Sequence, residues 1–294
     1  METSEYASVQ RANIVSWQDI RRSYAVLQAA ARDGGDVGSA WAGFAKGARD
    51  SESEPPYHLR TLLGLIKSAQ GDRPAADITI LDHGCGGGMT MFYLAALGYQ
   101  SVFGVDVGVE AELNNGIMAK AIGATDTRFF LYDGLRLPFE NECVDFVFSQ
   151  QVLEHVKDDV LDAYYSEEAR VLKAGGCAFH QVPHRFSPYD SHSATWFIHY
   201  FPTGIRDSLY RLFGKDPEYL NSMLHLRPPH VHRRKLVRHI GSCEDVTLAR
   251  LTNISDFKTE RHYGWDRVRS LSGSCRFSNA RVGFGQYGNS RPSR

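Results

Sequence analysis

The chain has 294 residues, a formal net charge of -1 at pH 7, and 43% hydrophobic and 23% charged residues. These values are ordinary for a globular protein and give no sign of an obligate polyanionic partner. The first ten residues, METSEYASVQ, lack the basic and apolar regions of a signal peptide, and no stretch of about 18 apolar residues predicts a membrane span. We therefore expect a cytoplasmic protein with no membrane span.

Cysteine spacing and charge distribution narrow the choice of partners. The five cysteines are scattered, and no two of them have the spacing of zinc ligands or of a disulfide framework, so we expect reduced thiols and no bound metal. The segment from residue 184 to 294 holds 18 Lys and Arg against 9 Asp and Glu. This excess favours either contact with an anionic substrate or a solvated basic surface, and both interpretations stay open.

The first 72 residues predict a helical extension. Apolar residues recur at helical spacing over 16–31, before Gly34 and Gly35. A second helix is expected over 58–69, after the break at Pro55 and Pro56.

From residue 73 the pattern changes to strands alternating with helices. Strands are expected at 78–82, 101–106, 128–133, 144–149 and 177–182, and helices at 89–98, 109–122 and 158–172, the last halted by Gly175 and Gly176. This alternation predicts an α/β fold with a doubly wound, mostly parallel sheet, seven-stranded and Rossmann-like, whose ligands bind at the carboxyl ends of the strands.

From residue 73 onward the chain is expected to divide into three parts. Residues 73–183 form the expected α/β core, and residues 184–229, rich in His, Pro and aromatic side chains, are expected to be a cap insertion after the fifth strand. Residues 230–294 are expected to complete the sheet with a helix at 232–240 and strands at 245–252 and near 276–284.

A glycine-rich loop follows the first expected strand, in the sequence Leu-Asp-His-Gly-Cys-Gly-Gly-Gly ending at Gly88. Glycines are needed there because the backbone must turn sharply and approach a ligand closely. Met89 occupies the last position of a Gly-x-Gly-x-x-Gly dinucleotide fingerprint that starts at Gly84, so that fingerprint fails. The spacing Gly-x-Gly-x-Gly holds instead at Gly84, Gly86 and Gly88.

Together with the carboxylates that end the next two strands and with the block SQQVLEHV, this loop resembles class I S-adenosylmethionine-dependent methyltransferases, of the type 11-like kind. The resemblance covers about residues 62–183 and, more loosely, 231–253. It implies S-adenosylmethionine as cofactor, with Asp106 on the ribose hydroxyls, Asp133 near the adenine and Asp82 near the methionine amino group. The complete set of expected cofactor-binding residues is Asp82, Gly84, Cys85, Gly86, Gly88, Asp106, Val107, Asp133, Gly134 and Gln150. Taken singly, Asp106 and Asp133 are also compatible with turn or helix-cap roles.

Two histidines after the fifth strand are candidate general bases. His184 and His192 lie in the segment HRFSPYDSHSATWFIHYFP, beside Arg185 and Asp190, and imidazole suits proton removal from a hydroxyl near neutral pH. The alternative is that these histidines only bridge an aromatic cap. By the resemblance, His155 is expected to help shape the cofactor pocket or the sheet edge. His83 departs from the family pattern, which has an apolar residue there, and is expected to pack in the core. Neither histidine is expected to act in catalysis.

We therefore predict methyl transfer to a small or medium-sized metabolite, on an oxygen of a saccharide-like or anionic acceptor. The alternatives are an RNA or protein methyltransferase, or a non-catalytic cofactor-binding module of the same fold. No nucleic-acid partner is expected, because SQQV lacks the Asn/Asp-Pro-Pro-aromatic motif and no Pro-Cys pair is present at the site. The basic run at 230–238 carries an apolar face and is interpreted as an amphipathic helix.

Overall fold

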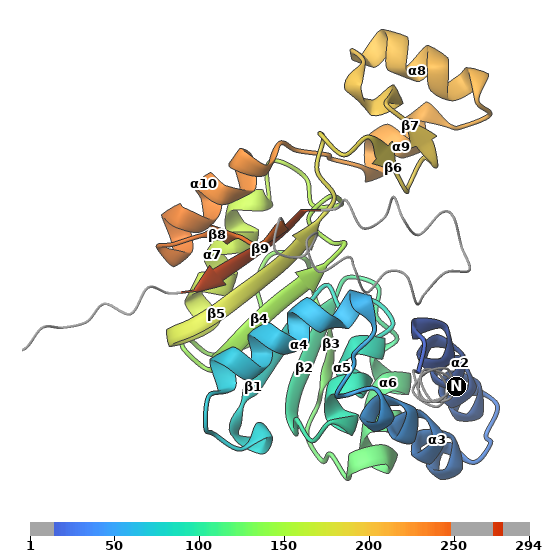
Figure 1. The fold of residues 1–294 in the computed structure, drawn as a ribbon, viewed down its shortest axis with the longest axis vertical. Coiled ribbons are helices and arrows are strands. Elements are labelled where there is room, and N and C mark those ends of the chain that lie inside the picture. The colour runs from blue at the N-terminus through green and yellow to red at the C-terminus, as the bar shows by residue number, and fades with distance from the viewer. Residues whose placement is uncertain (1–14, 248–272, 279–294) are drawn as a thin grey trace, which may run out of the picture.

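The computed structural model describes residues 15–247 and 273–278 (Figure 1). Its helices are α2 (Trp17–Arg32), α3 (Val37–Asp50), α4 (Tyr57–Gln70), α5 (Met89–Ala96), α6 (Ala111–Ile122), α7 (Leu161–Val171), α8 (Thr203–Leu212), α9 (Pro217–Met223) and α10 (Pro229–Ile240), with short 3₁₀ turns η1 (Ala75–Asp77) and η2 (Ile198–Tyr200). Its strands are β1 (Thr79–His83), β2 (Ser101–Asp106), β3 (Phe129–Leu131), β4 (Val144–Gln150), β5 (Leu172–Val182), β6 (Tyr189–Asp190), β7 (Thr195–Trp196), β8 (Glu244–Asp245) and β9 (Gly273–Ser278). Within these residues no helix is both long enough and apolar enough to cross a membrane.

Five parallel strands form the body of the sheet, in the order β3-β2-β1-β4-β5. This arrangement confirms the predicted α/β fold with a mostly parallel sheet. β9 then pairs with β5 in the antiparallel direction, and β8 pairs with β9 at the edge. The order reverses between β1 and β4, which is the place where open α/β sheets bind their ligands.

Each face of the sheet is covered by its own hydrophobic cluster. On one face α4, α5 and α6 supply residues such as Leu62, Phe92 and Ile117, and α2 and α3 pack outside them. On the other face α7 and α10 cover the sheet, with Tyr165 and Leu236 fully buried (Figure 1). Burial on both faces explains why successive residues of β4, from Val144 to Ser149, are all buried instead of every second one.

Two parts of the secondary structure differ from the prediction. Helix α3 was not predicted, because Gly38, Gly43 and Gly47 weaken its helical pattern; the Asp36 side chain caps it by accepting from the Ser39 N–H at 3.0 Å. The prediction that a turn at Gly175-Gly176 precedes the fifth strand was wrong. β5 begins at Leu172 and runs through both glycines, and its register against β4 shifts between Val144 and Phe146.

The region after β5 is more structured than its composition indicated. It holds the two-stranded β6–β7 hairpin, η2, α8 and α9, which extend away from the end of the sheet (Figure 1). Ile198, Tyr210 and Leu220 form a small core of their own. The four-part division of the chain stays a prediction. The strand expected at 245–252 is seen only as Glu244–Asp245, and its remainder after Thr247, like that of the last expected strand after Ser278, lies outside the described residues.

Candidate functional site

The glycine loop makes a sharp turn at the carboxyl end of β1. Gly84, Gly86 and Gly88 all have positive φ, at 96°, 50° and 85°. A Cβ on Gly84 would lie 2.4 Å from Val152, and one on Gly88 would lie 2.3 Å from Phe129, whereas a Cβ on Gly86 would meet no atom within 4 Å. Gly84 and Gly88 are therefore required by packing, while Gly86 leaves the backbone open toward the space above the loop.

Asp106 holds this loop and the end of β2 together. One carboxylate oxygen accepts from the Gly86 N–H at 2.9 Å, and the other accepts from the Gly108 N–H at 2.9 Å. Each carboxylate oxygen has a further lone pair, so the side chain can still accept from a ribose hydroxyl. Asp82 is 5% exposed on β1, and burial together with the charge of Asp106 raises its pKa well above the ordinary value.

A cleft of about 770 Å³ opens beside the loop, and helix α2 forms its other wall. The loop contributes Cys85, Gly86, Gly87, Gly88, Met89 and Thr90, and α2 contributes Arg21, Tyr24, Ala25, Gln28, Ala29 and Arg32, with Gly108 and Glu110 completing the wall. This volume suits a cofactor of nucleoside size.

Sequence reasoning gave α2 no part in the site. The Tyr24 hydroxyl donates to the Gly87 carbonyl, and the Gln28 amide donates to both the Tyr24 hydroxyl and Asn114 on α6. The sequence held one weak signal of this contact, because Tyr24 and Gln28 are polar residues one helical turn apart on a partly apolar helix.

The third strand ends in a different environment. Asp133 is exposed, and its Oδ1 accepts from the backbone N–H groups of Leu135 at 2.8 Å and Arg136 at 3.1 Å. These bonds lower the pKa of Asp133. Val107 is 66% exposed, and a Cβ on Gly134 would lie 3.4 Å from it, so the ends of β2 and β3 adjoin. The structure thus gives Asp133 the turn role, and its contact with adenine stays a prediction.

Gln150, at the end of β4, is tied to the protein. Its amide nitrogen donates to the His58 carbonyl at 3.2 Å and to the Gln181 side chain at 3.3 Å. It therefore joins β4 to α4 and β5, and its contact with the cofactor stays a prediction.

His83 is part of a buried network, as expected of a core residue. Its Nδ1 lies 2.9 Å from Glu168, its Nε2 lies 2.8 Å from the Tyr132 hydroxyl, and its ring stacks on Tyr164 with centroids 3.7 Å apart. Glu168 also lies 3.0 Å from Nε2 of His180. The two imidazoles beside the Glu168 carboxylate offset part of the cost of burying its charge.

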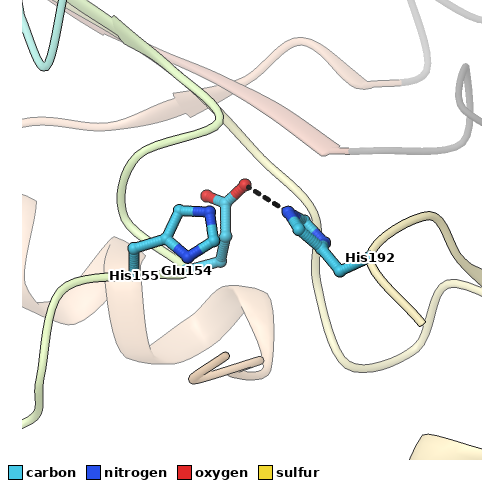
Figure 2. Close-up of side chains that lie close together, drawn as sticks. All are labelled: Glu154, His155 and His192. Atoms are coloured by element: carbon cyan, nitrogen blue, oxygen red, sulfur yellow. Dashed lines mark ion pairs between the residues drawn. The ribbon is translucent and has the colours of Figure 1, made fainter. Parts of the chain in front are cut away.

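The two candidate bases lie in different surroundings. His184 accepts through Nδ1 from the Phe186 N–H at 3.1 Å, and burial lowers its pKa. His192 has Nδ1 3.2 Å from Asp190 and Nε2 3.7 Å from Glu154. The structure thus brings His192 to the turn that follows β4, where Glu154 and His155 are its neighbours (Figure 2).

Two carboxylates with opposite pKa shifts flank His192. Burial raises the pKa of Glu154 to about 7. Burial would also raise the pKa of Asp190, but hydrogen bonds from His192 and Ser193 outweigh it and hold that pKa at about 2. Asp190 is therefore ionised beside one nitrogen of the imidazole, which is the arrangement that orients a functional histidine.

Residues 80–176 match a protein family described as a methyltransferase domain. This segment runs from β1 through the glycine loop and Asp106 into β5. Over this segment the chain resembles class I methyltransferase domains. The methyltransferase domain of this class uses S-adenosylmethionine, so the cofactor prediction is confirmed for this part of the chain.

Over 111 residues, 36% of this chain, the sequence is 35% identical to the ubiquinone biosynthesis O-methyltransferase of Rhizobium johnstonii. The chain spans 42% of that relative's length. Among solved structures, the geranyl diphosphate C-methyltransferase of Streptomyces coelicolor A3(2) is similar at 15% identity, with a TM-score of 0.48 over 80% of this chain and 81% of that one. The PH0226 protein of Pyrococcus horikoshii OT3 is 26% identical, with a TM-score of 0.34 over 43% of this chain and 57% of that one.

The described residues fit the cofactor of the methyltransferase domain. Above Gly86 the space is open, and a side chain at that position would fill the cradle of the loop. Asp106 supplies an acceptor at the end of β2, and the cleft under α2 has the necessary volume. These features fit a cofactor at the carboxyl ends of β1 and β2, and its binding by these residues stays a prediction.

Proposed function

We propose that the chain is an S-adenosylmethionine-dependent methyltransferase acting on an oxygen of a small or medium-sized acceptor, saccharide-like or anionic. The observation that carries the proposal is the glycine loop. The space beside Gly86 is open, the Gly86 N–H donates to Asp106, and both residues lie in the segment that matches methyltransferase domains. The similarity to an O-methyltransferase over 111 residues supports oxygen as the reacting atom.

The residues of the chain have three tasks in this reaction. The bound cofactor supplies an activated methyl group, so the protein must align the acceptor with it and exclude water. Asp106 and the loop bind and orient the donor, and α2 covers the cleft. The acceptor hydroxyl must also lose a proton, and we propose that this takes place near His192, at the turn after β4.

Cofactor binding tests the first part of the proposal. Calorimetric titration with S-adenosylhomocysteine should give one site per chain, and Asp106→Asn should weaken it at least tenfold, about 1.4 kcal/mol. Asp50→Asn, in the surface pair with Lys46 on α3, is the matched control. Tighter binding of a nicotinamide dinucleotide than of S-adenosylhomocysteine would contradict the proposal.

Transfer of a labelled methyl group tests the second part. The chain is incubated with labelled S-adenosylmethionine and extract from its own source, and the products are separated by class. Label in small molecules supports the proposal, whereas label in RNA or protein supports the alternative acceptors. Binding with no transfer supports a cofactor-binding module. His184→Ala and His192→Ala should each slow the chemical step more than tenfold if the residue removes the proton.

A further inference from the structure

Three side chains from two distant segments converge at the junction of the sheet and the cap. Glu154 and His155 belong to the turn after β4, and His192 belongs to the turn between β6 and β7. One potential ligand atom from each lies within 4.8 Å of those from the other two. Figure 2 shows the Glu154 carboxylate pointing toward His192, with the His155 ring beside it.

The Glu154 carboxylate is buried without a hydrogen-bond donor. The residue is 0% exposed, and neither carboxylate oxygen has a hydrogen-bond partner among the described residues. Its ion-pair partner is His192, whose Nε2 lies 3.7 Å from Oε1 of Glu154, beyond hydrogen-bond distance. Buried carboxylates are normally hydrogen-bonded, closely paired or bound to a metal, whereas the described residues give this one a long ion pair with His192 and no hydrogen bond.

Both histidines are oriented by acceptors on their other ring nitrogen. Nδ1 of His155 lies 2.6 Å from the Met223 carbonyl on α9, and this nitrogen must donate because a carbonyl oxygen only accepts. Nδ1 of His192 lies 3.2 Å from Asp190, whose other oxygen accepts from the Ser193 N–H. In each ring the outer acceptor therefore lies at Nδ1, which makes Nε2 the nitrogen suited to bind a metal, as in metal-ligating histidines with an outer acceptor.

We propose that Glu154, His155 and His192 bind one divalent ion of the first transition series. Two imidazole nitrogens and one carboxylate favour Zn²⁺, Mn²⁺ or a similar ion over Mg²⁺ and Ca²⁺, which prefer oxygen ligands. Metal bonds of about 2.0–2.2 Å require the three ligand atoms to move closer together. His192 lies on a short turn with 25% of its side chain exposed, so it can move toward Glu154.

The position of the ion indicates its use, which rests on the proposed methyl transfer. Three protein ligands leave coordination positions open to solvent and to an acceptor oxygen. An ion there lowers the pKa of a bound hydroxyl, whose proton passes to water; the oxygen then forms a bond to the methyl carbon while the carbon–sulfur bond breaks and its electron pair stays on sulfur. His192 then acts as a ligand and not as a base, which revises both that expectation and the expectation of no metal.

Metal binding tests the proposal directly on the full chain. After treatment with a chelator, the chain is titrated with Zn²⁺, Mn²⁺ and Mg²⁺ by calorimetry, and with Co²⁺ by visible absorption. We expect one transition-metal ion per chain, bound more tightly than Mg²⁺. Glu154→Gln and His192→Ala should each weaken binding more than tenfold, and Asp190→Asn about tenfold through the orientation of His192. His230→Ala is the matched control, because His230 is an exposed residue of α10.

Circular dichroism and thermal unfolding of each variant show whether it folds. Absence of binding to the wild-type chain, binding that survives both Glu154→Gln and His192→Ala, or tighter binding of Mg²⁺ overturns the proposal. Failure of the methyltransferase proposal is separate, because S-adenosylhomocysteine binding is measured on the metal-free chain. If the chain gives a Co²⁺ spectrum but does not bind S-adenosylhomocysteine, only the methyltransferase proposal is contradicted. If methyl transfer is unaffected by chelation, only the role of the metal in that reaction is contradicted.

Discussion

Asp106 and Asp133 end neighbouring strands, yet the structure gives them different partners. Asp106 bonds the backbone of the glycine loop at Gly86 as well as Gly108 in its own turn, whereas Asp133 bonds only the turn that follows it. A carboxylate shared between two segments that adjoin the cleft can both shape that cleft and contact its ligand. At the scale of single residues, the structural difference between these two aspartates is therefore the contact that Asp106 makes across strands.

Gly86→Ala tests whether the loop must stay open. We expect a loss of about 1–2 kcal/mol in stability from the positive φ, together with a loss of more than tenfold in affinity for S-adenosylhomocysteine, because the new methyl group enters the cradle. Thermal unfolding and calorimetry measure the two effects. Gly98→Ala, at φ 96° with no atom within 4 Å of its Cβ, carries the same backbone strain away from the cleft. If Gly98→Ala weakened the binding of S-adenosylhomocysteine as much as Gly86→Ala, the proposed site beside Gly86 would be wrong.

At the scale of elements, a side-chain hydrogen bond attaches α2 to the glycine loop. Tyr24→Phe removes the hydroxyl that bonds Gly87 and Gln28 while it keeps the ring packed on Phe92. We expect about 1 kcal/mol less stability and faster dissociation of S-adenosylhomocysteine, since the cover of the cleft loosens. Stopped-flow measurement gives the dissociation rate. Tyr219→Phe on α9, where the side chain is 61% exposed, serves as the control, and equal rates in the two variants would rule out this role for α2.

The hydrogen bonds of Asp145 also connect separate elements, and their contribution to stability depends on pH. Asp145 on β4 accepts from Arg73 at 2.7 Å, from Lys173 at 2.8 Å and from the Thr79 N–H at 3.0 Å. Burial acts to raise the pKa of Asp145, but these bonds outweigh it and lower that pKa below its ordinary value. A lowered native pKa stabilises the fold above the unfolded pKa of about 4, and this stabilisation is lost as pH falls through the native value.

Asp145→Asn should therefore cost about 1–2 kcal/mol near pH 7, a modest figure because Arg73 and Lys173 are each partly exposed. The difference in unfolding free energy between wild type and variant should shrink below about pH 4, as measured by urea unfolding across pH. Asp50→Asn, in a surface pair on α3, should show little change at any pH. A difference that stays constant with pH would show that the charge of Asp145 contributes nothing.

At the scale of the whole molecule, ligand binding should link parts that are far apart in sequence. At 100 times its dissociation constant, S-adenosylhomocysteine adds about 2.7 kcal/mol, which raises Tm by roughly 5–10 °C for a chain of this size. Hydrogen exchange should slow in α2, in the loop at 84–88 and at Gly108, but not in α8. Protection confined to the cap would place the ligand elsewhere.

The sequence predicted much of the core because its signals are local. Strands β1, β2 and β4 are short apolar or β-branched runs, and Gly84, Gly86 and Gly88 mark a turn that only glycine makes easily. The same reasoning missed α3, where three glycines conceal a helix that packing stabilises through Phe44 and Ala48. It also started the fifth strand at residue 177, after a glycine pair that the structure builds into β5.

The turn of the glycine loop at Gly84–Gly88 was thus determined by the sequence alone, because a backbone with positive φ favours glycine at each such position. The sequence likewise placed Asp106 at the end of the second strand. Only the tertiary structure decided that Tyr24 bonds the loop, that Asp133 caps its own turn, and that Glu154 and His155 meet His192. Those contacts join segments separated by tens of residues, and their geometry depends on how helices and the cap pack on the sheet, which local patterns do not encode.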